Sequence, residues 1–114
     1  MDALEMTLLY DYYGEMLTQR QRQCFDLRYN QDLSLGEIAQ ELHVSRQGVY
    51  DNLLRAEALL RNLEEKTGFV RRDLACRKAV KQITQAAKEL AGYDDPFVRE
   101  QAERILASAL VLEE

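Results

Sequence analysis

The stretch "GEIAQELHVSRQGVY" at residues 36–50 is a helix-forming run that breaks off once and begins again within three residues. Ser34 and Glu37, at its start, form the S-x-x-E pattern of a capping box, which predicts that a helix begins directly after Ser34. His43 stands where that helix must turn, and we expect a left-handed backbone there because His tolerates it better than a branched residue does. The break therefore limits the first helix to residues 35–42.

A second helix is predicted directly after the turn, with Ser45 as its N-cap and residues 46–66 as its body. Ala39 is small enough to let the two helices approach closely, and Val44 can fill the turn. Two helices joined in this way are typical of a helix-turn-helix, whose second helix enters the major groove of DNA. The residues expected to contact DNA are Ser45, Arg46, Gln47, Tyr50, Asp51 and Arg55.

The remaining sequence also predicts helices, because Ala, Leu, Glu, Gln, Arg and Lys dominate it and strictly alternating strand patterns are missing. The 114 residues suffice for one domain. We expect an all-α protein with a helix-turn-helix domain at residues 1–66. A C-terminal extension at residues 67–114 would add a basic and an acidic helix that pack on this domain or take part in dimerisation. Whether the helix continues through Gly68 is left open.

Each predicted helix has an apolar face. The expected buried residues are Leu4, Leu8, Leu9, Tyr12 and Tyr13 near the N-terminus, Cys24, Phe25 and Leu27 in the next helix, Leu35, Ile38, Ala39 and Leu42 before the turn, Val80, Ile83, Ala87 and Leu90 in the basic helix, and Val98, Ala102, Ile105, Ala109 and Leu112 in the last. Thr18 with Gln21 predicts a second capping box, and Asp95 with Pro96 predicts the start of the last helix.

The long helix at residues 46–66 carries more apolar positions than a small domain is expected to cover. Its seam has spacings of four and three residues, as in a coiled coil, and consists of Val49, Leu53, Ala56, Leu60 and Leu63. Each fully buried Leu would contribute roughly 1.5–3 kcal/mol. We therefore predict a homodimer built on this helix, which would present two recognition helices to a palindromic site.

The net charge of −5 is unevenly distributed, and one segment of the chain is strongly basic. Residues 66–88 carry a net charge of +6, and residues 89–114 carry −5. The basic segment could bind RNA or an acidic protein through Arg71, Arg72, Arg77, Lys78 and Lys81. Pairing with the acidic segment of the same chain or of another subunit explains the charges at least as well, so both interpretations stay open.

Several motifs resemble those of known proteins. "SLGEIA", "VSRQ" and "VYDN" follow one another with the order and spacing of the YlxM-type family of small helix-turn-helix proteins from Gram-positive bacteria. The preceding "LTQRQRQ" is similar to the promoter-reading last region of bacterial sigma factors. The resemblance covers about residues 8–66. It implies a DNA-binding fold and an association with the signal recognition particle pathway, whose protein or RNA would be the partner.

Two residues depart from the usual helix-turn-helix pattern. His43 stands where glycine is common, and Asn52 stands where an apolar residue is usual. A buried Asn needs hydrogen-bond partners, so Asn52 should either bond locally or face a partner subunit.

The sequence favours a regulatory or accessory DNA-binding protein. The alternative is a protein- or RNA-interaction module of the signal recognition particle without sequence-specific DNA binding. A sigma-like factor is disfavoured because the sequence lacks a region rich in the aromatics that open a promoter. An enzyme is disfavoured because His43 is the only histidine and the sequence has no metal-ligand cluster or phosphate-binding loop, so we expect no catalytic residues and no cofactor.

The sequence has no long apolar run, so we expect no membrane insertion. We expect Cys24 and Cys76 to be buried, reduced thiols of a cytoplasmic protein.

Overall fold

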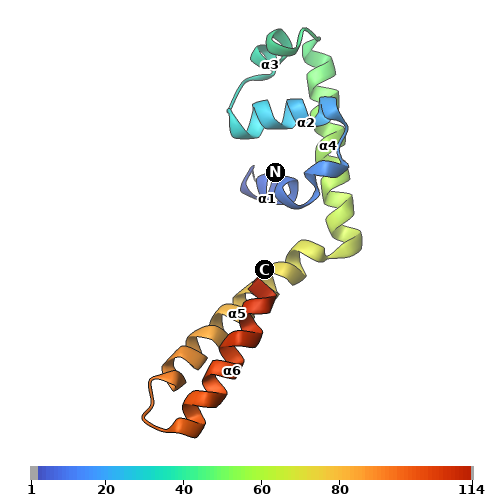
Figure 1. Ribbon diagram of the computed structural model, residues 1–114. Helices are drawn as coiled ribbons and strands as arrows, with labels where there is room; N and C mark the ends of the chain where they lie inside the picture. The colour runs from blue at the N-terminus through green and yellow to red at the C-terminus, as the bar shows by residue number, and fades with distance from the viewer. Residues whose placement is uncertain (1–2, 114) are drawn as a thin grey trace. The chain divides into compact units, whose positions relative to one another are not determined.

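The computed structural model describes residues 3–113, and every element of secondary structure among them is a helix (Figure 1). The all-α fold is therefore confirmed, and the helix predicted at residues 35–42 is present with those bounds. The main helices are α1 (Ala3–Tyr13), α2 (Gln19–Phe25), α3 (Leu35–Leu42), α4 (Arg46–Thr67), α5 (Phe69–Ala91) and α6 (Pro96–Glu113). A 3-10 turn at Gly14–Met16 follows α1, and a π-helical turn at Asp26–Asn30 follows α2.

Side-chain caps fix where the helices begin. The Thr18 hydroxyl accepts from the N–H of Gln21 at 3.2 Å, and the Gln21 side chain accepts from the N–H of Thr18 at 2.9 Å. Ser34 and Glu37 form the same reciprocal pair at the start of α3. Asp95 accepts from two N–H groups in the first turn of α6. These three predicted caps are confirmed, because such caps depend only on neighbouring residues.

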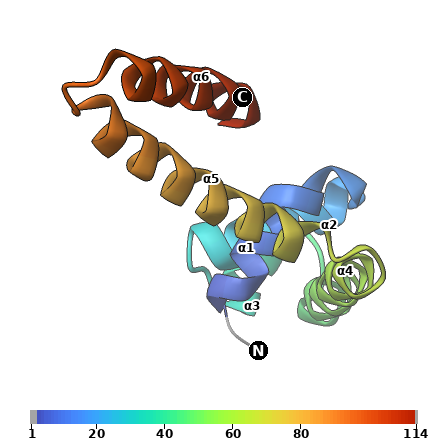
Figure 2. The same cartoon turned by 90° about the horizontal axis from the view of Figure 1, so that it is seen from below.

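The chain divides into two compact units, one ending at Val70 and the other beginning at Arg71. In the first unit, α4 is the longest helix, and α1, α2 and α3 all contact it. Figure 2 looks nearly along α4 and shows these three helices on one side of it. The first unit holds two apolar clusters, one consisting of Met6, Leu9, Tyr13, Leu17, Phe25, Ala56, Leu60 and Val70, and the other of Cys24, Ile38, Ala39, Val49 and Leu53.

The apolar seam of α4 is covered within its own unit. Val49, Leu53, Ala56 and Leu60 are all buried against α1, α2 and α3, and Leu63 is partly buried. The expectation that this seam needs a second subunit was therefore wrong. The short helices cover it because they all pack on the same side of α4, which the sequence pattern alone did not reveal.

A left-handed residue separates α4 from α5. Gly68 has φ 61°, so the helix is not continuous through it. The Tyr13 hydroxyl donates to the Glu64 carboxylate at 2.7 Å, and the same carboxylate accepts from the N–H of Val70 at 3.0 Å. Glu64 thereby links α1 to the first turn of α5.

The second unit is an antiparallel hairpin of α5 and α6 (Figure 1). Its buried apolar residues are mostly small: Val80 and Ala87 in α5, and Ala102 and Ala109 in α6. Four residues that were expected to be buried in this unit are exposed instead, namely Ile83, Leu90, Ile105 and Leu112. Two helices share a single seam, so within this unit the large side chains beside the seam are left uncovered.

Two further burial predictions fail. Leu4 is 78% exposed, because Met6, which the predicted stripe left out, takes the buried position in α1 together with Leu9. Cys24 is buried and burial raises the pKa of its thiol, whereas Cys76 is exposed on α5. Helical periodicity places a residue on a face, but tertiary neighbours decide whether that face is covered.

Candidate nucleic-acid interface

The turn between α3 and α4 is a Schellman motif built on His43. His43 has φ 57° and ψ 45°, which confirms the left-handed backbone that its position predicted. The N–H of Val44 donates to the Ala39 carbonyl at 3.0 Å, and the N–H of His43 donates to the Gln40 carbonyl at 3.4 Å. These two bonds define the motif and fix the direction in which the chain leaves α3.

An apolar core fixes the angle between α3 and α4. Ile38 and Ala39 of α3 are buried against Val49 and Leu53 of α4, and Val44 in the turn packs on the same cluster. Ala39 thus lies where the helices meet, as its small size predicted. The two helices form a rigid pair whose second member keeps one face outward.

Ser45 caps the recognition helix. Its hydroxyl oxygen accepts from the N–H of Gly48 at 2.9 Å, and its own hydroxyl hydrogen remains available to donate. A Cβ at Gly48 would come within 3.1 Å of that oxygen, so the glycine leaves room for the cap. The Asn52 side chain donates to the Gly48 carbonyl at 2.8 Å, so its partner is local, the first of the two arrangements expected for it.

Arg46 lies across the first turn of α3. A Cβ built on Gly36 would lie 3.0 Å from the Arg46 Nη2 atom and 3.1 Å from its Nε atom. The guanidinium therefore occupies the space that a side chain at Gly36 would fill. Arg46 remains exposed, but it points toward α3 rather than straight out from α4.

The other predicted contact residues lie on the exposed side of α4. Gln47 donates to the Asp51 carboxylate at 3.0 Å, one turn further along the helix. Tyr50 is 47% exposed, Arg55 is exposed, and Asp51 is half-buried. The structure thus brings the predicted residues together over the first three turns of α4, with a carboxylate among them.

A hollow of about 220 Å³ beside Tyr50 includes residues that the sequence did not single out. Its lining includes Arg28 and Tyr29 from the π-helical turn and Glu57 from α4. The Tyr29 hydroxyl donates to the Glu57 carboxylate, and burial together with this bond raises the pKa of Tyr29 to about 12. The guanidinium of Arg28 donates to the Leu33 carbonyl at 3.0 Å. Nothing in the local sequence pattern marks these residues, because they come together from the π-helical turn and from α4, which are far apart in the sequence.

The charge of this surface is only weakly basic. Residues 46–61 contain Arg46, Arg55 and Arg61 against Asp51 and Glu57, a net charge of +1. Proteins that neutralise many phosphates usually carry more positive charge on their recognition surface.

The second predicted patch lies on α5. Arg71, Arg72, Arg77, Lys78 and Lys81 are all exposed. Arg71 and Lys78, seven residues apart, share the side of α5 opposite the buried Val80. Lys81 lies nearer to α6 and lines a hollow together with Val80 and Glu113. Arg72 and Arg77 lie on other sides, and the Nε atom of Arg77 donates to Asp73 at 2.9 Å.

Residues 3–113 show neither a group of acidic, His and Cys side chains that could hold a metal ion nor a helix long and apolar enough to cross a membrane.

The sequence matches the model of a protein family described as "Putative helix-turn-helix protein, YlxM / p13 like", UPF0122, over residues 1–95. It is 58% identical over 71 residues to a UPF0122 protein of Thermoanaerobacter sp. strain X514, an alignment that covers 62% of this chain and 61% of the relative. The chain thus spans about three fifths of the length of this relative.

Longer alignments extend the similarity. A UPF0122 protein of Caldanaerobacter subterraneus subsp. tengcongensis is 50% identical over 84 residues, covering 74% of this chain and 72% of the relative. A UPF0122 protein of Geobacillus kaustophilus is 42% identical over 92 residues, covering 81% of this chain and 84% of the relative. The chain belongs to the UPF0122 family of YlxM / p13-like helix-turn-helix proteins.

Proposed function

We propose that this protein is a non-enzymatic, cytoplasmic DNA-binding protein with a regulatory or accessory role. The observation that carries the proposal is the rigid pairing of α3 and α4, which leaves the first three turns of α4 outward. A helix presented in this way fits a major groove about 12 Å wide. Family membership supports the same role, since the family is described as helix-turn-helix.

The exposed side chains suggest a division of roles. Gln47 suits a base edge, and Tyr50 suits a phosphate or a thymine methyl group. Arg46, held over the start of α3, is better placed for a phosphate beside the groove than for a base within it. Arg55 would contact the next phosphates along the backbone. Ser45 can donate its hydroxyl hydrogen to a phosphate, and Asp51 orients Gln47.

Fluorescence anisotropy tests this proposal. A duplex selected by the protein from a random pool should bind far more tightly than a scrambled duplex of the same length. The double change Gln47→Ala and Tyr50→Ala should lower that preference at least about tenfold, since each good base contact gives roughly 1–3 kcal/mol of discrimination. Arg61→Ala is the matched control, because it alters an exposed residue of α4 beyond the predicted contacts and should leave the preference intact. Equal binding of selected and scrambled duplexes at low salt would overturn the proposal.

A second candidate function rests on the basic side of α5. Arg71 and Lys78, with Lys81 at the edge toward α6, form an exposed basic stripe that suits the phosphates of an RNA or an acidic protein surface. We propose this as the alternative: an interaction module for the protein or RNA of the signal recognition particle, without sequence-specific DNA binding. The support is the positive stripe together with the resemblance to YlxM-type proteins.

A gel-shift titration with signal recognition particle RNA separates this alternative from DNA binding. Lys78→Gln with Lys81→Gln should weaken RNA binding and flatten its salt dependence. Arg99→Gln with Arg104→Gln on α6 removes the same charge and serves as the control. RNA binding that responds equally to both pairs would contradict a role for the stripe.

A further inference from the structure

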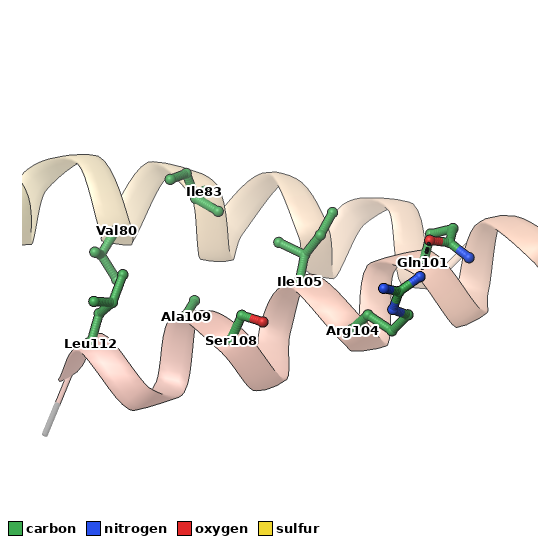
Figure 3. Close-up of a pocket in the computed structure, with 8 residues that line it drawn as sticks. All are labelled: Val80, Ile83, Gln101, Arg104, Ile105, Ser108, Ala109 and Leu112. Carbon is green, nitrogen blue, oxygen red and sulfur yellow. Dashed lines mark hydrogen bonds between the residues drawn. The ribbon is translucent and has the colours of Figure 1, made fainter.

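One face of the α5–α6 hairpin is an open groove of about 410 Å³, lined mostly by apolar side chains, with Gln101, Arg104 and Ser108 on its α6 side (Figure 3). Arg104 donates to the Gln101 side chain at 3.1 Å there. Val80 and Ala109 lie deep between the two helices, and Ile83, Ile105 and Leu112 stand along the groove. Ile83 is 49% exposed, Ile105 39% and Leu112 64%. These three large apolar side chains thus lie beside the core of the unit rather than in it.

The open side of α5 has the spacing of a helix-packing seam. Cys76, Ala79, Ile83, Ala86 and Leu90 follow one another at three, four, three and four residues, with no charged residue among them. These five residues lie on a different face of α5 from the buried Val80 and Ala87, which face α6. A second seam of this regularity on one helix is typical of packing against a further helix. Its small residues, Ala79 and Ala86, would allow a close approach.

The charge of the hairpin changes sign along its length. Residues 71–81 carry +4, and residues 89–103, around the connecting loop, carry −4. The whole of residues 71–114 is neutral. The basic half of α5 lies beside the end of α6, near Leu112 and Glu113, where Glu113 is the only acid among residues 105–113.

This distribution is self-complementary in one orientation. If two hairpins lie face to face and antiparallel, the +4 half of each covers the −4 loop end of the other. A parallel arrangement places like charges together. Charge complementarity of this kind selects orientation in helix packing.

We propose that the occupant of this groove is the α5–α6 hairpin of a second copy of the chain, packed antiparallel to form a four-helix bundle. The dimer thus assigned uses the extension at residues 71–114 and not the seam of α4, which its own unit covers. The two ends of the seam on α5, Cys76 and Leu90, each lie seven residues from Ile83. In this arrangement the twofold axis passes beside Ile83, which meets the partner's Ile83. Cys76 then lies opposite the partner's Leu90.

Sedimentation equilibrium on the full chain at micromolar concentration should give twice the mass of the 13.2 kDa chain. Ile83→Glu should shift the dissociation constant at least a hundredfold and yield monomers whose helical circular dichroism is retained, since Ile83 is half-exposed in the single hairpin. Gln85→Glu is the matched control, because it adds the same charge to an exposed position on the opposite side of α5. A wild-type chain that stays monomeric, or a dimer that survives Ile83→Glu, would overturn the proposal.

Oxidative cross-linking tests the orientation independently. In the antiparallel bundle the two Cys76 residues are about 21 Å apart along the helices, at 1.5 Å per residue, too far for a disulfide. The wild-type dimer should therefore remain uncross-linked, whereas Ile83→Cys in a Cys76→Ser background should give a cross-linked dimer. Cross-linking through Cys76 with none through residue 83 would refute the antiparallel arrangement.

Discussion

Single side chains position the recognition helix at three points. His43 holds the left-handed turn, the missing side chain at Gly36 makes room for Arg46, and Tyr29 bonds Glu57 beside Tyr50. The conformation of His43 could be predicted from the sequence because the turn is local. The direction of Arg46 could not, since it depends on Gly36, ten residues away on another helix.

His43→Gly should stabilise the protein. A non-glycine residue in the left-handed region costs roughly 1–2 kcal/mol, and glycine removes this cost while losing about 0.5–1 kcal/mol in backbone entropy. We therefore expect a gain of up to about 1 kcal/mol in urea unfolding. His43→Val, whose branched side chain tolerates the turn poorly, should lower the free energy of unfolding, and a loss of stability with glycine would contradict the role given to this turn.

Tyr29→Phe should change the response of stability to alkaline pH. Burial and the bond to Glu57 raise the folded pKa of Tyr29 to about 12, above its ordinary value of 10.0. The stability contributed by the protonated hydroxyl is therefore full below pH 10 and is lost as pH rises through 12. At neutral pH the variant should lose about 1–2 kcal/mol, because Glu57 loses its donor. The difference from wild type should shrink between pH 10 and 12, as urea unfolding at each pH would show. A constant difference would argue against the bond.

At the scale of helices, the sequence predicted the ends better than the faces. Caps such as those of Ser34 and Ser45 join residues three apart in the sequence, so whether the cap forms can be predicted without knowing the rest of the fold. Burial depends on how many neighbours a helix has. The apolar seam of α4 is buried because three helices pack on that side of it. Ile83 and Leu112 are exposed because their unit has only two helices and one seam between them.

Ser34→Ala should measure the contribution of the capping box to α3. Loss of the hydroxyl that accepts from the N–H of Glu37 should cost about 1 kcal/mol in thermal or urea unfolding. Ser108→Ala, an exposed serine within α6, should cost close to nothing. Equal effects of the two changes would show that the cap does not determine the stability of α3.

At the scale of the molecule, the two units differ in charge. Residues 1–70, which contain the recognition helix, carry the whole net charge of −5, and residues 71–114 are neutral. A weakly basic recognition surface on an acidic unit should bind DNA through few phosphates, so pairing of two such surfaces would matter. The division between the units after Val70 follows from contacts within the chain.

The salt dependence of DNA binding should therefore be shallow. If Arg46 and Arg55 are the phosphate contacts and two copies bind one site, four phosphates are neutralised, and the slope of log K against log salt should be about −4. Arg55→Ala should reduce its magnitude by about 2 in the dimer. A slope near −10, measured by anisotropy from 50 to 200 mM salt, would require contacts beyond α4.

A titration of the ¹⁵N-labelled chain with a selected duplex, followed by amide chemical shifts, tests the central claim most directly. DNA recognition by α4 predicts that the largest changes fall at residues 45–55 and at the start of α3 around Gly36, with small changes in residues 71–88. Changes confined to residues 71–88, or none at protein concentrations of hundreds of micromolar and low salt, would contradict recognition through α4.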